Sequence, residues 1–183
     1  PSWKILPALV TGNTVVFKSS QFAPKSAHNL VAALEEAGVP PGVLNMVYGE
    51  GAVVGGAIID HPSINLISFT GSNAVGRTIA MRCAELGKSV SLEMGGKNAI
   101  TVLDDADLDL ALEGVLWSAF GTTGQRCTAA SRVIVQSGVY DAFAAKLVER
   151  TKKLRLGNGL DDATDVGPVV NTSQLEKIAS YMP

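Results

Sequence analysis

The chain has 183 residues, 46% of them hydrophobic and 17% charged, and its formal net charge at pH 7 is -2. This composition excludes a disordered chain and provides enough apolar material for a folded core. It also argues against nucleic-acid binding, which needs clustered Lys and Arg, and against a membrane span, because polar residues interrupt every apolar stretch well before roughly 18 residues.

The first half of the chain alternates helix and strand patterns. A helical pattern begins at the first residues, and the β-branched run 14–17 after the Gly12-Asn13 turn predicts the first strand. Short strands separated by single helices predict right-handed crossovers, and hence a Rossmann-like parallel sheet with helices on both faces. Ligands of such sheets bind at the carboxyl ends of the strands. The predicted strands are 14–17, 44–48, 64–69 and 88–93, and the later helices are 24–37, 52–59 and 74–85.

The pattern changes at Gly95-Gly96, where we place a domain boundary. Residues 1–95 read as part of a nucleotide-binding domain, and residues 96–183 as the start of a second α/β domain. The second part has predicted strands at 99–103 and 132–136 and predicted helices at 108–120 and 139–153. The chain begins at Pro1 without an initiator Met and stops at Pro183, close to another helical pattern. We therefore expect it to be a fragment of a longer protein.

A candidate anion site lies at residues 69–77, where a predicted strand runs into a predicted helix. Gly71 and Gly76 allow close backbone approach, and the free N–H groups of a helix start favour a phosphate group. A P-loop is not favoured, because Arg77-Thr78 stands where that motif requires Lys and Ser or Thr. The alternative is that Ser72 caps the helix and binds nothing.

Two charged side chains end predicted strands. Lys18 follows the strand 14–17 and Glu93 ends the strand 88–93, so both belong to the predicted ligand edge. Either could simply be a solvated strand end. The neighbours Met94, Gly95 and Gly96 predict that Glu93 is free to move and partly buried, and both features suit a general base.

The two cysteines have different surroundings. Cys83 lies within a predicted helix and reads as a buried, inert residue. Cys127 follows the Gly-rich stretch 121–124 and precedes small residues, which leaves room for a carbonyl substrate, so we predict a nucleophile there. Neither has the spacing of a metal ligand. Without a signal peptide, reduced thiols and a cytoplasmic location are expected.

Five segments occur together in an order that resembles the aldehyde dehydrogenase superfamily, over essentially the whole chain. They are Thr11-Gly12-Asn13-Thr14-Val15-Val16-Phe17-Lys18, Gly42-Val43-Leu44-Asn45, Phe69-Thr70-Gly71-Ser72, Leu92-Glu93-Met94-Gly95-Gly96-Lys97 and Gly124-Gln125-Arg126-Cys127. The resemblance implies an enzyme that uses NAD or NADP to oxidise a small-molecule aldehyde. It also implies that residues 1–95 belong to the NAD(P)-binding domain, that residues 96–183 begin the catalytic domain, and that the parent protein is a homodimer or homotetramer.

By the same resemblance, Cys127 attacks the aldehyde to form a thiohemiacetal, and Glu93 activates the water that releases the acid from a thioester. The Cys127 N–H would supply half of an oxyanion hole. The implied substrate contacts are Trp3, Arg126 and Thr128, although a structural role for Arg126 is an open alternative. The implied cofactor contacts are Lys18, Gln21, Gly49, Gly51, Gly71, Ser72, Val75, Met94 and Gly95.

The chain also departs from the family pattern. The oxyanion Asn and the Glu-Ile-Phe-Gly-Pro segment of the family are absent, so we expect the fragment to be inactive alone. Gln21 stands where many NAD-preferring members carry Glu. A carboxylate there repels the 2′-phosphate of NADP, so its absence predicts dual use or a preference for NADP.

Several segments are similar to bacterial 2-oxoglutarate semialdehyde (2,5-dioxopentanoate) dehydrogenases, notably residues 92–98, 102–109 and 167–170. The alternatives are another semialdehyde or betaine-type member, or a non-catalytic nucleotide-binding relative. A CoA-acylating member is disfavoured because Glu93, which hydrolytic deacylation uses, is present.

Overall fold

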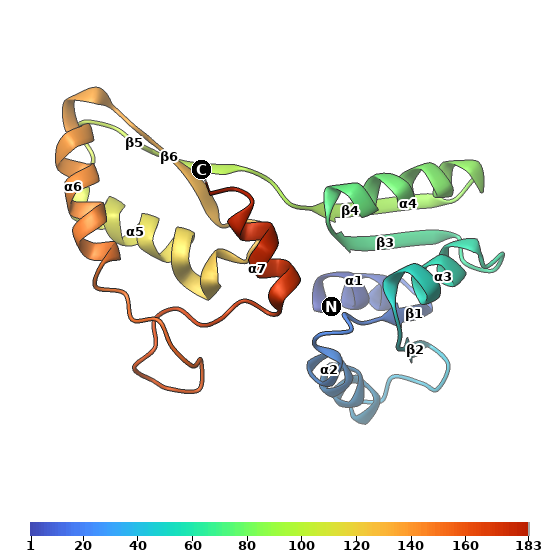
Figure 1. Cartoon of the computed structure of the whole chain (residues 1–183). Helices are drawn as coiled ribbons and strands as arrows, with labels where there is room; N and C mark the ends of the chain where they lie inside the picture. Colours follow the sequence, from blue (N-terminus) through green and yellow to red (C-terminus); the bar gives the residue numbers. More distant parts are fainter. Residues whose placement is uncertain (183) are drawn as a thin grey trace. The chain divides into compact units, whose positions relative to one another are not determined.

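Six strands pair as three parallel ladders, β1 with β2, β3 with β4 and β5 with β6, in a computed structural model that describes residues 1–182. Each crossover between paired strands contains at least one helix, as parallel pairing requires (Figure 1). The chain divides into two compact units, Pro1–Met94 and Gly95–Pro183. The α/β class and the parallel pairing that the sequence predicts are confirmed.

The first unit contains four strands and four α-helices. Two predicted elements differ in detail: the expected helix 52–59 opens with a π-helical turn, and the strand expected at 64–69 begins and ends two residues later. The elements are α1 (Ser2–Val10), β1 (Val15–Lys18), α2 (Pro24–Glu36), β2 (Leu44–Val47), η1 (Gly51–Gly55), α3 (Gly56–Asp60), β3 (Leu66–Gly71), α4 (Asn73–Glu85) and β4 (Ser89–Met94).

The strands of the first unit form two separate pairs rather than one continuous four-stranded sheet. Within residues 1–94, neither β1 nor β2 forms a ladder of hydrogen bonds with β3 or β4. Helix α1 contacts both pairs, because it packs on β1 and because Lys4 Nζ donates a 3.0 Å hydrogen bond to Ser68 Oγ of β3. The crossover rule predicts parallel neighbours, but it does not predict which strands pair directly.

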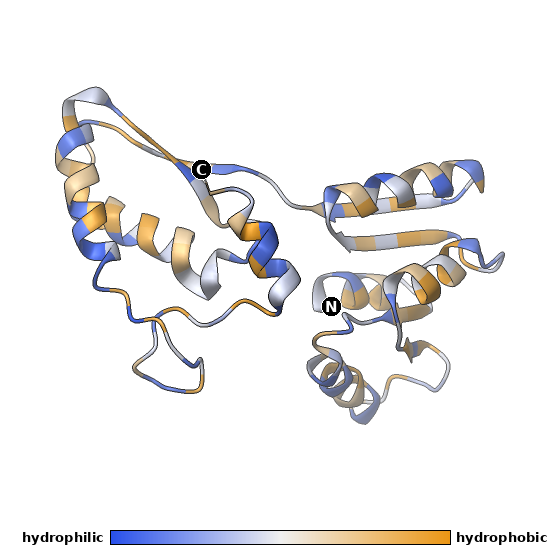
Figure 2. Cartoon of the chain, viewed as in Figure 1, coloured by the Kyte–Doolittle hydropathy of each residue, from blue (hydrophilic) through white to orange (hydrophobic). Residues whose placement is uncertain are grey.

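Two small apolar clusters hold the first unit together. Ile5 of α1, Val31 of α2 and Leu44 of β2 form one, and Ile67 of β3 packs with Ile79 and Cys83 of α4 in the other. Figure 2 shows the apolar colouring of β3, beside which α4 lies. Each fully buried aliphatic side chain contributes about 1.5–3 kcal/mol.

The second unit contains one strand pair and three α-helices. Its predicted helix 139–153 is shorter than expected, because residues 137–139 form a 3₁₀ turn and the helix runs from Tyr140 to Thr151. The elements are β5 (Asn98–Val102), α5 (Leu108–Phe120), η2 (Gly121–Gly124), β6 (Ala130–Val135), η3 (Ser137–Val139), α6 (Tyr140–Thr151) and α7 (Thr172–Ala179).

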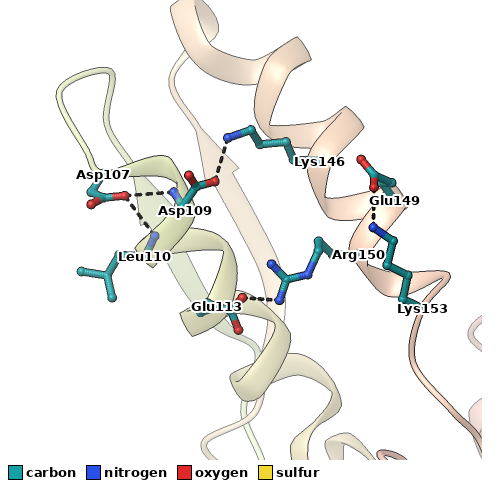
Figure 3. Close-up of polar contacts among 8 residues, drawn as sticks. All are labelled: Asp107, Asp109, Leu110, Glu113, Lys146, Glu149, Arg150 and Lys153. Atoms are coloured by element: carbon teal, nitrogen blue, oxygen red, sulfur yellow. Dashed lines mark hydrogen bonds and ion pairs between the residues drawn. The ribbon is translucent and has the colours of Figure 1, made fainter.

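Packing of α5 and α6 beside β5 and β6 forms the core of the second unit. Phe143 of α6 is buried among Leu112, Val115 and Leu116 of α5 and Val102 of β5. Ion pairs cross the rim of this contact: Lys146 with Asp109 at 2.7 Å, and Arg150 with Glu113 (Figure 3). Because these charges are largely exposed, each pair is worth only about 0–1 kcal/mol, so the apolar contacts dominate.

Asp107 begins α5 as its N-cap, since its carboxylate accepts hydrogen bonds from the N–H groups of Asp109 and Leu110 (Figure 3). This is the helix-capping role that an acidic residue before a helix typically has. Among residues 1–182, no group of three or more His, Cys, Asp and Glu side chains is arranged to hold a metal ion. Over the same residues, no helix is both long and apolar enough to cross a membrane.

Candidate active site

The carboxyl ends of β3 and β4 bring Glu93 and Met94 beside the start of α4. The parallel register pairs Thr70 with Glu93 and Gly71 with Met94. Glu93 is exposed, so the prediction that it is partly buried is wrong: it lies at the end of β4, where no side chain of the described part of the chain covers it. Ser72, which follows Gly71 at the end of β3, is the N-cap of α4. Four residues that the sequence predicts for the site, Gly71, Ser72, Glu93 and Met94, are therefore neighbours on one strand edge.

The amino end of α4 is suited to an anion. Ser72 Oγ accepts a 3.3 Å hydrogen bond from the Val75 N–H, so Ser72 has the capping role that the sequence left open. The first N–H groups of a helix have no intrahelical acceptor, and the first turn of α4 carries no acidic side chain that would repel an anion. The geometry fits a phosphate group.

Two glycines near this helix start leave space that neighbouring side chains fill. A Cβ on Gly76 would lie 2.4 Å from Met94 Sδ, and a Cβ on Gly71 would lie 2.3 Å from the Phe69 ring. Both contacts are shorter than real Cβ contacts. Gly76 therefore leaves room for the Met94 side chain of β4 against α4, and Gly71 leaves room for the Phe69 ring within β3, which are packing roles in addition to any role toward a ligand.

Lys18 and Gly49 mark the corresponding edge of the β1–β2 pair. Lys18 ends β1 opposite Val47, and its Nζ donates a 2.6 Å hydrogen bond to the Ser19 carbonyl. Gln21 is exposed three residues later. Gly49 has φ +138°, and a Cβ there would lie 2.6 Å from Val54 Cγ2, so only glycine fits between β2 and η1. Gly51 opens η1.

In the second unit, Cys127 lies on a tight turn that we call the thiol turn, residues 126–129. The Ala129 N–H closes it with a 3.0 Å hydrogen bond to the Arg126 carbonyl. Cys127 and Thr128 are both exposed. Among residues 1–182, the Cys127 N–H has no hydrogen-bond acceptor, so it remains available to a bound molecule.

The segment before the thiol turn has unusual backbone angles. Thr122 and Thr123 have φ values of 53° and 59°, and Gly124 follows at 65°. For a non-glycine residue this left-handed conformation costs about 1–2 kcal/mol. Thr123 Oγ1 donates a 3.2 Å hydrogen bond to the Gly167 carbonyl, which helps to hold the segment. Such strain persists only where surrounding contacts fix it.

Three side chains that the sequence analysis did not select as site residues brace the thiol turn. Asn98 Nδ2 donates to the Cys127 carbonyl at 2.6 Å and to the Ala129 carbonyl at 3.3 Å. Ser118 Oγ accepts the Ala130 N–H at 3.1 Å. Trp117 lies under the Arg126 guanidinium at 4.0 Å from the ring centroid. Sequence offered a weak signal for Asn98, its place after Gly95-Gly96-Lys97, and none for Ser118.

Arg126 is turned toward α5. Its guanidinium donates a 3.2 Å hydrogen bond to the Trp117 carbonyl, and its Nε is buried without an acceptor among residues 1–182. A cation over an aromatic face is held by about 0.5–2 kcal/mol. This arrangement supports the structural role for Arg126 that the sequence left open beside a substrate contact.

The remaining candidates are placed as follows. Trp3 on α1 is 89% exposed. Val75 is exposed in the first turn of α4, and Gly95 is exposed at the start of the second unit. Two surface hollows, one along α5 and α6 and one beside residues 35–45, include neither Cys127 nor Glu93.

A family model described as the aldehyde dehydrogenase family matches residues 1–183. The chain belongs to the aldehyde dehydrogenase family. It is 47% identical over 182 residues to an alpha-ketoglutaric semialdehyde dehydrogenase of Bacillus subtilis, covering all of this chain and 37% of that protein. It is 43% identical over 180 residues to a betaine aldehyde dehydrogenase of Mesorhizobium japonicum, covering 98% of this chain and 37% of the relative.

Solved structures of the family give the same result for the fold. Betaine aldehyde dehydrogenase of Staphylococcus aureus in complex with NAD+ matches with a TM-score of 0.95 and 41% identity, over 99% of this chain and 36% of that one. An NADP dependent enzyme of E. coli matches with a TM-score of 0.93 and 44% identity, over 97% of this chain and 37% of that one. The chain therefore spans little more than a third of the length of these relatives.

The two thiols should differ in reactivity. Cys83 is completely buried, and burial raises the pKa of its thiol, whereas Cys127 is exposed. In the native protein at pH 8, iodoacetamide should alkylate Cys127 at least 10-fold faster than Cys83, as measured by peptide mass spectrometry. In denaturant the two rates should converge. Equal native rates would contradict the burial described here.

Proposed function

We propose that this chain carries the nucleophile and the general base of an NAD(P)-dependent aldehyde dehydrogenase that oxidises an aldehyde to a carboxylic acid. One observation carries the proposal: Cys127 is exposed on a braced turn and its backbone N–H is free. A buried structural cysteine such as Cys83 has neither property. Membership of the family supports the same chemistry.

In the proposed reaction, the sulfur of Cys127 attacks the aldehyde carbon and forms a thiohemiacetal. The Cys127 N–H donates a hydrogen bond to the oxygen on which negative charge develops, and such donors are worth about 2.7–4 kcal/mol each. NAD(P)+, when bound, would supply the hydride acceptor, and loss of the hydride from this carbon as the C=O bond re-forms would leave a thioester on Cys127. Glu93 then takes a proton from water, the hydroxyl adds to the thioester carbon, and the C–S bond breaks to release the acid.

The cofactor would be held by residues at the strand edges of the first unit. The N–H groups at the start of α4, with Ser72 and Gly71, suit the pyrophosphate, and Lys18 suits a ribose hydroxyl. Gly49, Gly51 and Val75 would border the adenine. Met94 and Gly95, next to Glu93, complete the proposed contacts. The NAD+ complex of the Staphylococcus aureus relative supports this cofactor class.

For the substrate we propose a semialdehyde, with 2-oxoglutarate semialdehyde as the first candidate. The similarity to the Bacillus subtilis enzyme, and the 45% identity to an alpha-ketoglutarate semialdehyde dehydrogenase of Haloferax volcanii, support it. Betaine aldehyde is the second candidate, because relatives of that name are 41–44% identical. Trp3 and Thr128 are the proposed substrate contacts, with Arg126 as a third.

We further propose that the parent protein works in the cytoplasm as a homodimer or homotetramer. Both cysteines are free, which suits a reducing compartment. Size-exclusion chromatography with light scattering on the full-length protein measures the oligomeric state directly.

Turnover of the full-length protein tests the activity. We expect reduced-cofactor formation at 340 nm with 2-oxoglutarate semialdehyde, at a higher kcat/KM than with succinate semialdehyde, betaine aldehyde or a simple aliphatic aldehyde. Cys127→Ala should abolish turnover, because the other cysteine, Cys83, is buried and cannot reach a substrate. Cys83→Ala should retain turnover. Cofactor binding without turnover of any aldehyde would instead identify a non-catalytic nucleotide-binding relative.

Gln21 should influence the choice between NAD and NADP. A carboxylate at this exposed position, three residues after Lys18, would repel the 2′-phosphate of NADP. We expect Gln21→Glu to lower kcat/KM for NADP by about 10-fold, and to change kcat/KM for NAD by less than about threefold. The matched control is Gln174→Glu, an amide-to-acid change on α7. Equal effects on the two cofactors would remove Gln21 from the cofactor site.

A further inference from the structure

We infer that Asn98 is a positioning residue for Cys127, acting through the backbone of the thiol turn; the inference rests on the proposed function. Its side chain is the direct link between β5 and the residue that carries the sulfur. Asn98 Nδ2 lies 2.6 Å from the Cys127 carbonyl oxygen and 3.3 Å from the Ala129 carbonyl oxygen. One amide group thus holds both ends of the Cys127–Ala129 segment.

The orientation of this amide is determined by its partners. Both neighbours are carbonyl oxygens, which only accept hydrogen bonds, so the nitrogen and not the oxygen of Asn98 must face them. The Asn98 backbone is held as well, because its own carbonyl accepts a 3.4 Å hydrogen bond from Ser131 Oγ. The donor is therefore fixed at both its main chain and its side chain.

An irregularity in the strand pairing places Asn98 at the turn. The β5–β6 register pairs Asn98 with Ala130 but Ala99 with Arg132, so Ser131 has no partner in the ladder. Such bulges change the direction of a strand and of its side chains. Here the irregularity of β6 comes directly after the thiol turn. The Asn98 side chain therefore reaches from β5 to the carbonyls of Cys127 and Ala129.

The other contacts of the turn act elsewhere. Ser118 holds the Ala130 N–H, and Arg126 is bound to Trp117. Among residues 1–182, Asn98 is the donor to the carbonyl of Cys127 itself. Because that carbonyl, the N–H and the Cβ belong to one residue, holding the carbonyl restricts where the sulfur and the free N–H point. Misplacement by about 1 Å can reduce the rate of a reaction about 100-fold.

The experiment uses Asn98→Asp in the full-length protein. Aspartate has nearly the same shape, but its ionised carboxylate accepts hydrogen bonds and donates none, so it would repel both carbonyls. The matched control is Asn45→Asp, since Asn45 of β2 donates from Nδ2 to the Gly42 carbonyl at 2.8 Å and neither residue is proposed for the site. Asn98→Ala is the second variant, in case the aspartate does not fold.

We expect Asn98→Asp and Asn98→Ala to lower kcat by 10- to 100-fold with KM changed by less than threefold, and Asn45→Asp to change neither by more than twofold. Amide hydrogen exchange of residues 124–131 should be at least 10-fold faster in the Asn98 variants, while exchange in α5 and α6, whose side chains form the core of the same unit, stays within twofold of wild type. The combination indicates an intact fold with a misplaced thiol.

Two results would overturn the inference: kcat within twofold of wild type in the Asn98 variants, or loss of kcat together with faster exchange throughout α5 and α6, which would indicate unfolding of the second unit. A wild-type protein that turns over no aldehyde would refute the proposed function instead. In that case the exchange measurement still decides whether Asn98 holds the thiol turn.

Discussion

The hydrogen bond from Asn98 to the Cys127 carbonyl is the constraint on which the thiol site depends. The chain reaches Cys127 through Thr122 and Thr123, whose left-handed backbone is unfavourable, and through a glycine that adds no side-chain contact. Local preferences would not keep this segment in one conformation. The turn is instead defined by contacts from β5, from α5 and from Gly167. The exposed thiol of Cys127, which we propose as the nucleophile, can thus have a fixed position, because the backbone of Cys127 is held while its sulfur makes no disulfide bond.

The two units position polar groups in different ways. In the first, parallel strands end at the start of a helix, so the register that pairs Thr70 with Glu93 also sets a carboxylate beside a place suited to an anion. In the second, a core centred on Phe143 holds α5 against β5 and β6, and α5 in turn supplies Ser118 and Trp117 to the thiol turn. In both units, small apolar clusters hold helices against strands, and these helices and strands position the polar groups.

Residue patterns predicted the elements well and their lateral arrangement less well. The sequence pattern located the six strands of residues 1–182 to within about two residues, and parallel pairing followed from the intervening helices. The split of the first unit into two strand pairs was not predicted, because hydrogen bonding between strands distant in sequence leaves no local signal. The contrast between Cys83 and Cys127 was visible in sequence, since one lies in a regular helical pattern and the other among glycines and small residues. The contacts of Asn98 were not visible in the sequence, because they join Asn98 to residues that lie 29 and 31 positions further along the chain.

The central claim is that Cys127 forms a covalent thioester which Glu93 hydrolyses, and trapping that species tests it most directly. The full-length Glu93→Gln protein is mixed with an aldehyde and oxidised cofactor, quenched in acid within seconds, digested and analysed by mass spectrometry. The account predicts an acyl group on Cys127 in most of the protein, none on Cys83, and much less acylation in wild type, where hydrolysis continues. No acyl adduct on Cys127 in the variant, while the wild type oxidises the same aldehyde, would contradict it.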